Sequence, residues 1–546
     1  MAIGAILRFS QLTAKPPWTD EFATLVFSLG NSYKAVPLDQ VISVDTLLKP
    51  LQLNPTADAS AVMRHLFAED HHPPLYFVLA HWWMYLLPKS GEYVSLWAAR
   101  SLPALFGVAS IPAVYGLGLL AFRSRLVAQL AAAMMAVSPY GIFIAQEARH
   151  YTLGILWIIA SLCCLVVAVG HLKRRTLLPI WLALCWVVVN ALGMATHYFF
   201  SLTLCAEAIV LIGFWMKHRL QGNQKFQSEG KQSKDAPLPT FRANRWRMCA
   251  VAVGTLVGCL VWVPILQMGA KGEMTQWIKM GAPSILTVIS PIFQALATWI
   301  AMLALLPVES PELPVIIASG LVMLVFFIWA IPILYRSLKV LRQKPDTRLA
   351  TGILGGFVLG AIAIFFGITY ILGIDLTRGA RYNFVYFPAV IVVLGAALSI
   401  SWNTSQTVNS FQLTNSNHPK SKILNPKSNS GKLAVALIWF VGLLSGITVI
   451  NNLGYQKYYR PDLLAPVIQK ASSAPILIAT THNTLVQTGE MMGLAWEFKR
   501  VAEAQKLPLE LTFLLAHQEQ EQCVNTSVSE GIQQPACSAS TTLKHA

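Results

Sequence analysis

Two adjacent carboxylates near the start of the chain, Asp20 and Glu21, are the residues best suited to chemistry. They follow the polar stretch Pro16–Thr19, and a third acidic group stands in the run Asp70–Pro74, which also holds two histidines. A carboxylate within hydrogen-bond reach of a hydroxyl can take its proton as that hydroxyl attacks, which is general-base chemistry. The chain has only 25 acidic residues among 546, so three of them in one polar segment indicate a site for acid-base work.

These residues also have structural interpretations. Asp20 and Glu21 suit a helix N-terminus in a solvated loop, because the helix dipole stabilises acidic side chains there. Asp70 suits a cap of the helix that follows it. His71 and His72 could bind a divalent metal together with Asp70, but adjacent histidines point apart on most backbones. We therefore predict no metal site and no required cofactor, while dependence on a divalent metal stays open.

The composition is that of a polytopic membrane protein. Hydrophobic residues make up 55% of the chain, charged residues 12%, and the mean hydropathy is +0.54, whereas soluble domains carry about 25% charged residues. A span needs about 20 mostly apolar residues, and about ten stretches meet that requirement. We place them near residues 97–122, 126–145, 152–170, 177–196, 198–216, 248–268, 314–335, 351–373, 384–401 and 433–450.

The net charge of +16 lies in the loops. If the spans alternate in direction, the basic segments fall on one side of the membrane, which the positive-inside tendency identifies as cytoplasmic. Contact with anionic lipid headgroups, at about 1 kcal/mol per surface Lys or Arg, then accounts for the basic balance, and we expect no nucleic acid partner. The basic segments are Arg123 with Arg125, Lys173–Arg175, Lys217–Arg247, Arg336–Lys344 and Lys420–Lys432.

The same alternation assigns the candidate residues to the outer face. Residues 285–307 are apolar enough to span, but counting them would send Arg336–Lys344 outward, so we predict an interfacial or re-entrant helix there. We expect a multi-pass protein of the plasma membrane whose active site faces the extracytoplasmic side. The outer segments are residues 9–93, Gln146–Tyr151, the turn at His197, residues 269–313, Asp375–Asn383 and everything after 451.

The chain divides into residues 1–93, 94–450 and 451–546. The first part is an N-terminal remnant with an extracytoplasmic loop. Met1–Phe9 is too short to span, so we expect that the chain begins late and that part of a first helix is missing. The loop closes with the aromatic run Pro74–Leu87, which predicts a helix on the membrane surface.

The middle part is the multi-span domain, and two polar cytoplasmic linkers interrupt it. Residues 217–247 and 403–432 have no hydrophobic period, so we expect both to be disordered, and we expect the same from Gln518 onward. Six of the eight cysteines lie in spans without metal-ligand spacing. Cys523 and Cys537 lie in the outer tail, where they could form a disulfide or stay free.

The last part has the composition of a soluble protein. Pro475–Thr480 is typical of a buried strand and Leu485–Arg500 of a helix, which together predict a small αβ segment. The predicted fold class is therefore an all-α polytopic membrane bundle with an extracytoplasmic first loop and a small C-terminal αβ extramembrane segment.

An ordered set of motifs runs through the outer segments: Asp20-Glu21, Asp70–Tyr76 ahead of the aromatic helix, Arg100–Gly107, Gln146–Tyr151, Thr196–Phe199, and Arg381-Tyr382 before Pro388, with Tyr455–Asp462 as a weaker match. Together they resemble the GT-C superfamily of membrane glycosyltransferases. Within it, the bacterial branch similar to protein O-mannosyltransferases and aminoarabinose transferases is nearest. No single motif is specific, but their order is, and the resemblance covers roughly residues 5–460.

The resemblance implies inverting transfer of a sugar from a polyprenyl-phosphate donor to a glycan, lipid or protein acceptor on the outer face. Asp20 is the candidate base, with Glu21 and Asp70 completing the catalytic set. The departing phosphate needs fixed cationic donors, for which the planar fork of arginine is well suited, and Arg149 and Arg381 are the candidates. The candidate substrate-orienting residues are His72, Glu147, Tyr151, His197 and Tyr382.

Other interpretations stay open. Arg149 could instead pair with Glu147, and Arg381 with Asp375, as structural ion pairs; His197 could be a packed, hydrogen-bonded residue. A lipid or oligosaccharide transporter or flippase would want charged residues within the spans, where Glu207 is a rare example. A non-catalytic envelope assembly protein, with the tail as its functional part, is the third candidate.

Overall fold

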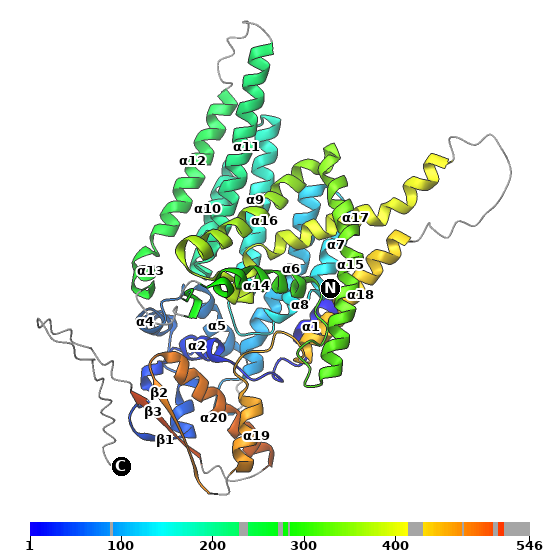
Figure 1. Ribbon diagram of the computed structural model, residues 1–546. Coiled ribbons are helices and arrows are strands. Elements are labelled where there is room, and N and C mark those ends of the chain that lie inside the picture. The colour runs from blue at the N-terminus through cyan, green and yellow to red at the C-terminus, as the bar shows by residue number, and fades with distance from the viewer. Residues whose placement is uncertain are drawn as a thin grey trace, which may run out of the picture.

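The structure is a computed structural model, and it describes residues 1–87, 91–228, 239–270, 277–281, 284–412, 430–471, 474–505 and 511–517. A bundle of long helices forms most of the molecule, and a small unit of helices and strands lies at one end of it (Figure 1). The predictions for the central parts of the two linkers, for Cys523 and Cys537, and for the residues from Gln518 onward lie outside the described residues.

Helices occupy all the predicted spans. Within the described part of the chain, seven helices are long and apolar enough to cross a membrane, and several predicted spans coincide with shorter apolar helices. The seven are α6 (Leu96–Phe122), α9 (Tyr151–Arg174), α11 (Phe200–Ser228), α14 (Ile285–Leu303), α15 (Leu313–Gln343), α16 (Pro345–Leu372) and α18 (Ser430–Ile450). The others of the bundle are α7 (Arg125–Val137), α8 (Pro139–Phe143), α10 (Ile180–Thr196), α12 (Pro239–Leu260), α13 (Val263–Ala270) and α17 (Phe387–Gln412).

The stretch predicted as one span at residues 126–145 is two helices. Pro139 cannot donate a backbone hydrogen bond, so it opens a new helix, α8, at its first position. The Ser138 side chain caps that helix by accepting a hydrogen bond from the Gly141 N–H at 3.2 Å. The chain therefore turns before it reaches Gln146, which leaves the segment Gln146–Tyr151 at the end of the bundle.

The helix α14 differs in direction from its neighbours. It is apolar and long enough to span, but Figure 1 shows it running across the direction of α9, α11 and α12. Its outer side is covered with exposed apolar side chains such as Leu286 and Phe293. An interfacial or re-entrant helix in this segment stays a prediction, and the orientation of α14 across the other helices is consistent with it.

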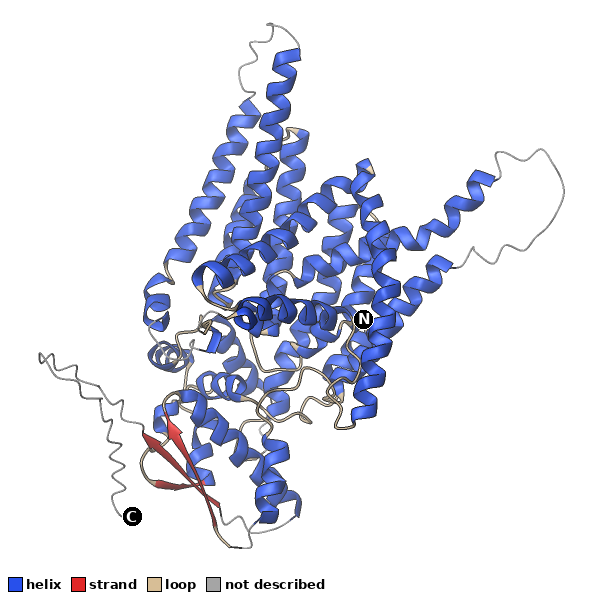
Figure 2. Ribbon diagram, viewed as in Figure 1, coloured by secondary structure: helices blue, strands red, loops and turns tan. Residues whose placement is uncertain are grey.

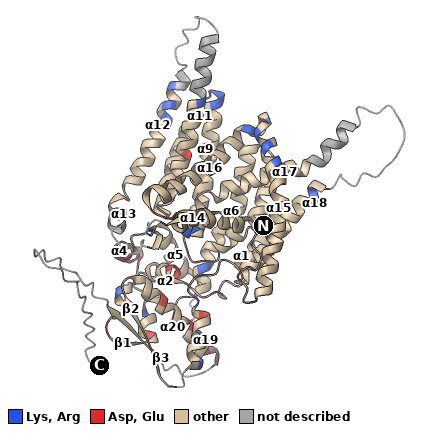
Figure 3. Cartoon of the chain, viewed as in Figure 1, with Lys and Arg blue, Asp and Glu red and all other residues tan. Residues whose placement is uncertain are grey.

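The charged side chains separate along the bundle. Figure 3 shows Lys and Arg gathered at one end of the long helices, at the labelled tops of α11 and α12, and Asp and Glu mostly near the opposite end around α2, α19 and α20. This separation is the one that the alternating spans predict. It places the candidate site at the end away from the basic loops.

The unit at that end combines the first loop with the last part of the chain. A three-stranded sheet has the order β1-β3-β2, with β1 antiparallel and β2 parallel to β3 (Figure 2). Its strands are β1 (Val41–Ser43), β2 (Ile476–His482) and β3 (Leu511–His517), and its helices are α2 (Thr19–Ser28), α3 (Val44–Leu48), α4 (Ala59–Glu69), α5 (Leu75–Leu86), α19 (Pro461–Ala471) and α20 (Leu485–Gln505).

One apolar core holds this unit together. Phe22 and Leu47 from the first loop pack with Met492 and Phe513 from the last part of the chain, and all four are fully buried. The predicted αβ segment is therefore present, but it takes a strand from residues 41–43 that sequence did not predict. The boundaries at 93 and 451 stay predictions.

Two elements of this unit differ from expectation in their burial. The predicted buried strand is β2, but it lies at the sheet edge and Leu477 is 52% exposed; the central strand is β3. The predicted surface helix is α5, and it packs Tyr76 and Phe77 into the protein while Trp82 is exposed. An edge strand has a neighbour on one side only, which explains the exposure of β2.

The central position of β3 generates a stability prediction. Phe513→Ala should destabilise the unit formed by the first loop and the last part of the chain, here called the outer unit, by about 3–5 kcal/mol, because the substitution leaves a cavity in a closed core. Leu477→Ala in the neighbouring strand should change stability by less than about 0.5 kcal/mol. The measurement is the temperature at which α20 becomes cleavable by protease in the purified protein. Equal losses in the two variants would contradict the assignment of β3 as the buried strand.

Candidate active site

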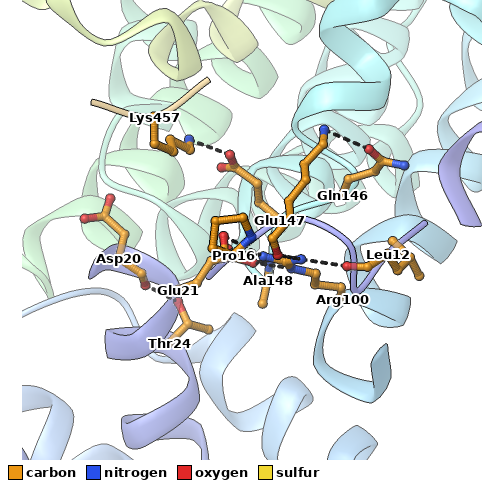
Figure 4. Close-up of polar contacts among 11 residues, drawn as sticks. Leu12, Pro16, Asp20, Glu21, Thr24, Arg100, Gln146, Glu147, Ala148 and Lys457 are labelled. Carbon is orange, nitrogen blue, oxygen red and sulfur yellow. Dashed lines mark hydrogen bonds and ion pairs between the residues drawn. The ribbon is translucent and has the colours of Figure 1, made fainter. Parts of the chain in front are cut away.

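The two adjacent carboxylates of α2 face different surroundings. The helix begins at Thr19, and Asp20 and Glu21 lie in its first turn. Successive residues of an α-helix differ in direction by about 100°, and Figure 4 shows the two side chains pointing apart. Glu21 is fully buried, whereas the Asp20 side chain is 30% exposed. The helix geometry thus separates a structural carboxylate from an accessible one.

Glu21 forms a buried, two-point ion pair with Arg100 of α6. Arg100 donates from Nε to Oε1 at 2.8 Å and from Nη2 to Oε2 at 2.6 Å. Arg100 also donates to the carbonyls of Leu12 and Lys15, and Glu21 Oε1 accepts from the Ala148 N–H at 2.7 Å. Both carboxylate oxygens are engaged and out of solvent, so Glu21 positions the site and is not free for the catalytic role that sequence suggested.

Asp20 faces both candidate arginines. Its Oδ2 lies 3.4 Å from Arg381 Nη2 and 3.7 Å from Arg149 Nη2. These separations are longer than a charge-assisted hydrogen bond, which is about 2.7–2.9 Å, so Asp20 is in weak ionic contact with both arginines. The structural alternatives are not observed: Asp375 pairs with Arg378, and Glu147 pairs with Lys457.

Each arginine is held by other contacts as well. Arg149 donates from Nη1 to the Asp20 carbonyl and to the Thr24 hydroxyl, both at 2.8 Å. Arg381 lies over aromatic rings, with its Cζ 4.8 Å from the centroid of Trp18, 5.2 Å from that of Trp277 and 5.2 Å from that of Tyr382. Cation–π contacts of this kind hold a guanidinium without occupying its N–H groups. The Nε of both arginines is buried and has no partner among the described residues.

The charges determine the protonation state of Asp20. Burial by itself would raise the pKa of this carboxyl, but the positive charges of Arg381 and Arg149 outweigh it, and the pKa lies below its ordinary value. In turn Asp20 raises the pKa of Arg381 against the opposing effect of burial. The carboxylate is therefore ionised at neutral pH, which is the state required of a proton acceptor.

Asp70 and His72 lie at the end of α4, on the side of the site nearest α5. Asp70 does not cap the following helix, contrary to the structural alternative; it ends α4, and α5 begins after Pro74 without a side-chain cap. Its Oδ2 lies 2.9 Å from His72 Nδ1. The His72 ring is 5.6 Å from that of His150, and a positive charge on it would lower the pKa of Asp20. Asp70 is thus positioned to act through His72.

Two further candidates, Tyr151 and His197, lie near Arg149 and His150 respectively. Tyr151 lies with its ring centroid 5.9 Å from Arg149 Cζ. His197 is buried, with its ring centroid 4.4 Å from that of His150, and its Nδ1 accepts a hydrogen bond from the Phe199 N–H. His197 is thus a packed and hydrogen-bonded residue, as its structural interpretation held.

Lys457 and Trp18 belong to the site but were not predicted. Lys457 follows the last helix of the bundle and returns to the site, where its Nζ lies 2.5 Å from Glu147 Oε1 and 3.8 Å from the Trp18 ring centroid. Figure 4 shows Lys457 and Glu147 pointing toward one another. Trp18 thus contacts both Lys457 and Arg381. The weak motif at Tyr455–Asp462 was the only sequence signal for Lys457, and a tryptophan in a membrane protein is normally interfacial.

Within the described residues there is no cluster of three or more His, Cys, Asp or Glu side chains with metal-binding geometry. Asp70 and His72 are close, but His71 adopts a left-handed backbone conformation, with φ +64°, and its carbonyl accepts a hydrogen bond from the Tyr198 hydroxyl. The two histidines and Asp70 therefore do not converge on one point. Dependence on a metal stays an open prediction.

No protein-family model and no curated protein sequence matches the chain. Among solved structures, an oligosaccharyltransferase of Archaeoglobus fulgidus tethered with an acceptor peptide is similar over 90% of this chain, at 14% identity and a TM-score of 0.43, and the chain spans 62% of its length. ArnT of Cupriavidus metallidurans bound to undecaprenyl phosphate is similar over 91% of this chain and 87% of its own, at 12% identity and a TM-score of 0.42.

The buried ion pair generates a second stability prediction. Glu21→Met leaves Arg100 buried without a counter-charge, which should cost about 3–5 kcal/mol. The double variant Glu21→Met/Arg100→Met removes both charges and should be more stable than the single variant. Asp45→Asn, which breaks the exposed pair with Lys499, should cost at most about 1 kcal/mol. Thermal unfolding of the purified protein measures all three.

A single variant as stable as Asp45→Asn would show that the Glu21–Arg100 contact does not hold the site. A double variant less stable than the single one would show that the hydrogen bonds of Arg100 to backbone carbonyls matter more than the charge pair.

Proposed function

We propose that this protein is an integral membrane glycosyltransferase that moves a sugar from a polyprenyl-phosphate donor to an acceptor hydroxyl on the extracytoplasmic face, with inversion. The observation that carries the proposal is the arrangement of a partly exposed Asp20 carboxylate within 3.7 Å of Arg149 and 3.4 Å of Arg381. A carboxylate and two arginines supply the two opposite charges that such a transfer needs. The motifs that resemble the GT-C superfamily contribute all three residues.

The reaction is a displacement at the anomeric carbon. The acceptor oxygen forms a bond to this carbon, and its proton passes to the Asp20 carboxylate. The bond between the anomeric carbon and the phosphate oxygen breaks, and its electron pair leaves with the lipid phosphate. Arg149 and Arg381 stabilise the charge that develops on the leaving group. The present contacts of Asp20 with the two arginines are longer than charge-assisted hydrogen bonds, so an entering phosphate competes with weak contacts for the guanidinium N–H groups.

A small apolar hollow lies near the segment that carries Arg381. It lies between the 3-10 helix η5 (Ala380–Val385), α14 and α16, and its volume is about 260 Å³ including the solvent at its open side. Its walls are mostly apolar and include Trp299 and Phe365. A lipid phosphate held by Arg381 would have its first isoprene units against this surface, and the apolar outer side of α14 would continue the path toward lipid.

The residues predicted to orient the substrate fall into two sets, those that would contact the sugar and those that lie near the cationic groups. Tyr382 and Trp277 enclose the Arg381 guanidinium, and aromatic faces of this kind also pack against sugar rings. His72, with Asp70 behind it, is the ionisable group nearest α5 that faces Asp20. We assign His72 and Tyr382 to contact with the sugar, and Tyr151, His197 and Glu147 to support of the cationic groups.

The transporter interpretation receives less support. Glu207 lies in α11 and is buried, but its carboxyl accepts a hydrogen bond from Ser161, which is also bonded to Asn190 and Trp186. These contacts join α9, α10 and α11. A carboxyl engaged in this way ties helices together, and it lies apart from Asp20 and the arginines on the outer end.

The base assignment predicts that Asp20→Asn lowers transfer by about 10²–10⁴-fold while the amount of folded protein is unchanged, because the side chain is partly exposed. The matched control is Asp45→Asn, another acidic residue of the first loop, which should retain full activity. The assay is the release of labelled sugar from a panel of polyprenyl-phosphate sugars by purified protein in lipid. Retained activity in Asp20→Asn would reject this carboxylate as the base.

The phosphate assignment predicts that undecaprenyl phosphate stabilises the native protein against thermal unfolding but does not stabilise the Arg381→Gln variant. A ligand that binds only the folded state raises the melting temperature, and at 100 times its Kd the effect on stability is about 2.7 kcal/mol. The rise in Tm should be present in the native protein and in Arg500→Gln, whose side chain is 60% exposed, and absent in Arg381→Gln. An equal rise in all three would place the phosphate elsewhere.

A further inference from the structure

A second hollow adjoins Trp18, whose ring also contacts Arg381. Its volume is about 440 Å³ including the solvent at its open mouth, and it lies between the loop that precedes α2, the Gln146–Glu147 turn and the segment that follows α18. Its polar lining includes Lys15, Glu147, Tyr455 and Lys457. The proposed reaction uses none of these residues except Glu147, as a support. Figure 4 shows this region above Pro16 and Glu21, beside the labelled Gln146 and Lys457.

Lys15 differs from the other cations that line this hollow. Arg100 pairs with Glu21, Lys457 with Glu147, and Arg460 with Asp462 at 2.7 Å. Lys15 also lines the hollow, and the described ion pairs leave it without a carboxylate of its own. It donates only one hydrogen bond, at 3.1 Å, to the neutral amide oxygen of Gln146. Lys15 is therefore a lining cation without an ion pair of its own among the described residues; Glu309, whose Oε2 accepts a hydrogen bond from the Gln456 N–H, is a further carboxylate that interacts with it electrostatically.

The surroundings of Lys15 lower its pKa. Burial lowers the pKa of Lys15 to about 7; Glu147 opposes the effect, and the positive charges of Arg100 and Lys457 add to it. An ammonium group placed close to two cations, with part of its hydration removed, is stabilised by any anion that reaches it.

Three buried polar atoms on the same lining have no hydrogen-bond partner among the described residues. They are the indole Nε1 of Trp18, the hydroxyl of Tyr455 and Oε2 of Glu147. Trp18 and Glu147 are more than nine-tenths buried. Buried polar groups are nearly always hydrogen-bonded in the working state of a protein, because leaving one unpaired costs about 1–3 kcal/mol. Two of the three are donors and the third is an acceptor.

We infer that this hollow binds an anionic group, a carboxylate or a phosphate, of a hydroxyl-bearing acceptor, with Lys15, Trp18 and Tyr455 as the donors and Glu147 as the acceptor for a neighbouring hydroxyl. The inference rests on the proposed function, because it assigns the acceptor to one side of Trp18 and the lipid phosphate to the other. The acceptor is thereby an acidic or phosphorylated glycan or glycolipid.

Trp18 connects the two sides. Its ring contacts Lys457, which lines the hollow, and also Arg381, which pairs with Asp20. An acceptor held by its anionic group beside Lys457 would extend past the Trp18 ring toward Asp20. The reacting hydroxyl of such an acceptor lies outside the hollow, on the Asp20 side of the Trp18 ring.

The experiment measures the reactivity of Lys15 in the full-length protein. Lysine residues are labelled with an amine-reactive reagent across a range of pH, and the rate at each lysine is followed by mass spectrometry. The probes are inorganic phosphate, glucose 6-phosphate, glucuronate and glucose. At about ten times its Kd, a probe that binds Lys15 should slow its labelling about tenfold. Lys34, which is exposed, is the internal reference.

Protection of Lys15 by glucose 6-phosphate and glucuronate, but not by glucose, is the expected result. Protection by glucuronate alone or by the phosphates alone identifies which anion the site takes. Protection by glucose equal to that by the charged sugars, or no protection by any probe, overturns the inference. Labelling of Lys34 should not respond to any probe.

Two variants keep this test separate from the proposed function. Lys15→Gln should leave hydrolysis of the polyprenyl-phosphate sugar donor unchanged, while transfer to a charged acceptor loses its advantage over transfer to a neutral one. Asp20→Asn should lose both reactions but retain anion protection of Lys15. If Lys15→Gln keeps its preference for charged acceptors while Asp20→Asn loses both reactions, the acceptor site is rejected and the proposed function stands.

Discussion

The buried ion pair between Glu21 and Arg100 is the interaction on which the rest of the site depends. It joins α2 to α6 and, through further hydrogen bonds, to the preceding loop and to the Gln146–Tyr151 segment. Charges removed from water are stable only when their partners are complete, and here every oxygen of Glu21 is used. Because Asp20 is adjacent to Glu21 on the same helix, this ion pair also determines the direction in which the Asp20 side chain points.

The two ion-pair systems on α2 differ in the way that a functional site requires. Glu21 and Arg100 are in close two-point contact and shielded from solvent. Asp20 lies 3.4 Å from Arg381 and 3.7 Å from Arg149, and its own side chain is 30% exposed. The pairing on one side of the helix is thus close and buried, and that on the other side is longer and reaches solvent, which is the arrangement that the proposed reaction needs.

The outer unit also explains how the chain ends affect the site. Gly489 of α20 lies against Thr19, where a Cβ atom would be 3.3 Å from the Thr19 Cα, and β3 pairs with β1 from the first loop. The segment that carries Lys457 leads directly into this unit. Residues that follow the last span thus support the position of Asp20, and the tail cannot be treated as separate from the catalytic part.

Several features follow from the sequence by itself. The helices of the bundle, the division of basic and acidic residues between its two ends, the αβ segment, and the candidates Asp20, Arg149 and Arg381 could all be predicted, because apolar length, charge distribution and motif order are local or cumulative properties of the chain. The different environments of Asp20 and Glu21 could not be predicted, since both are carboxylates in the same turn.

Only the tertiary structure determined which partner each charge has. Arg100 lies 79 residues from Glu21, and Lys457 approaches Glu147 from the far end of the chain. The exposure of β2 and the central place of β3 were decided in the same way, by a strand contributed from residues 41–43. Ion pairing and sheet order depend on distances through space. The spacing of residues along the sequence does not show which distant segments come into contact.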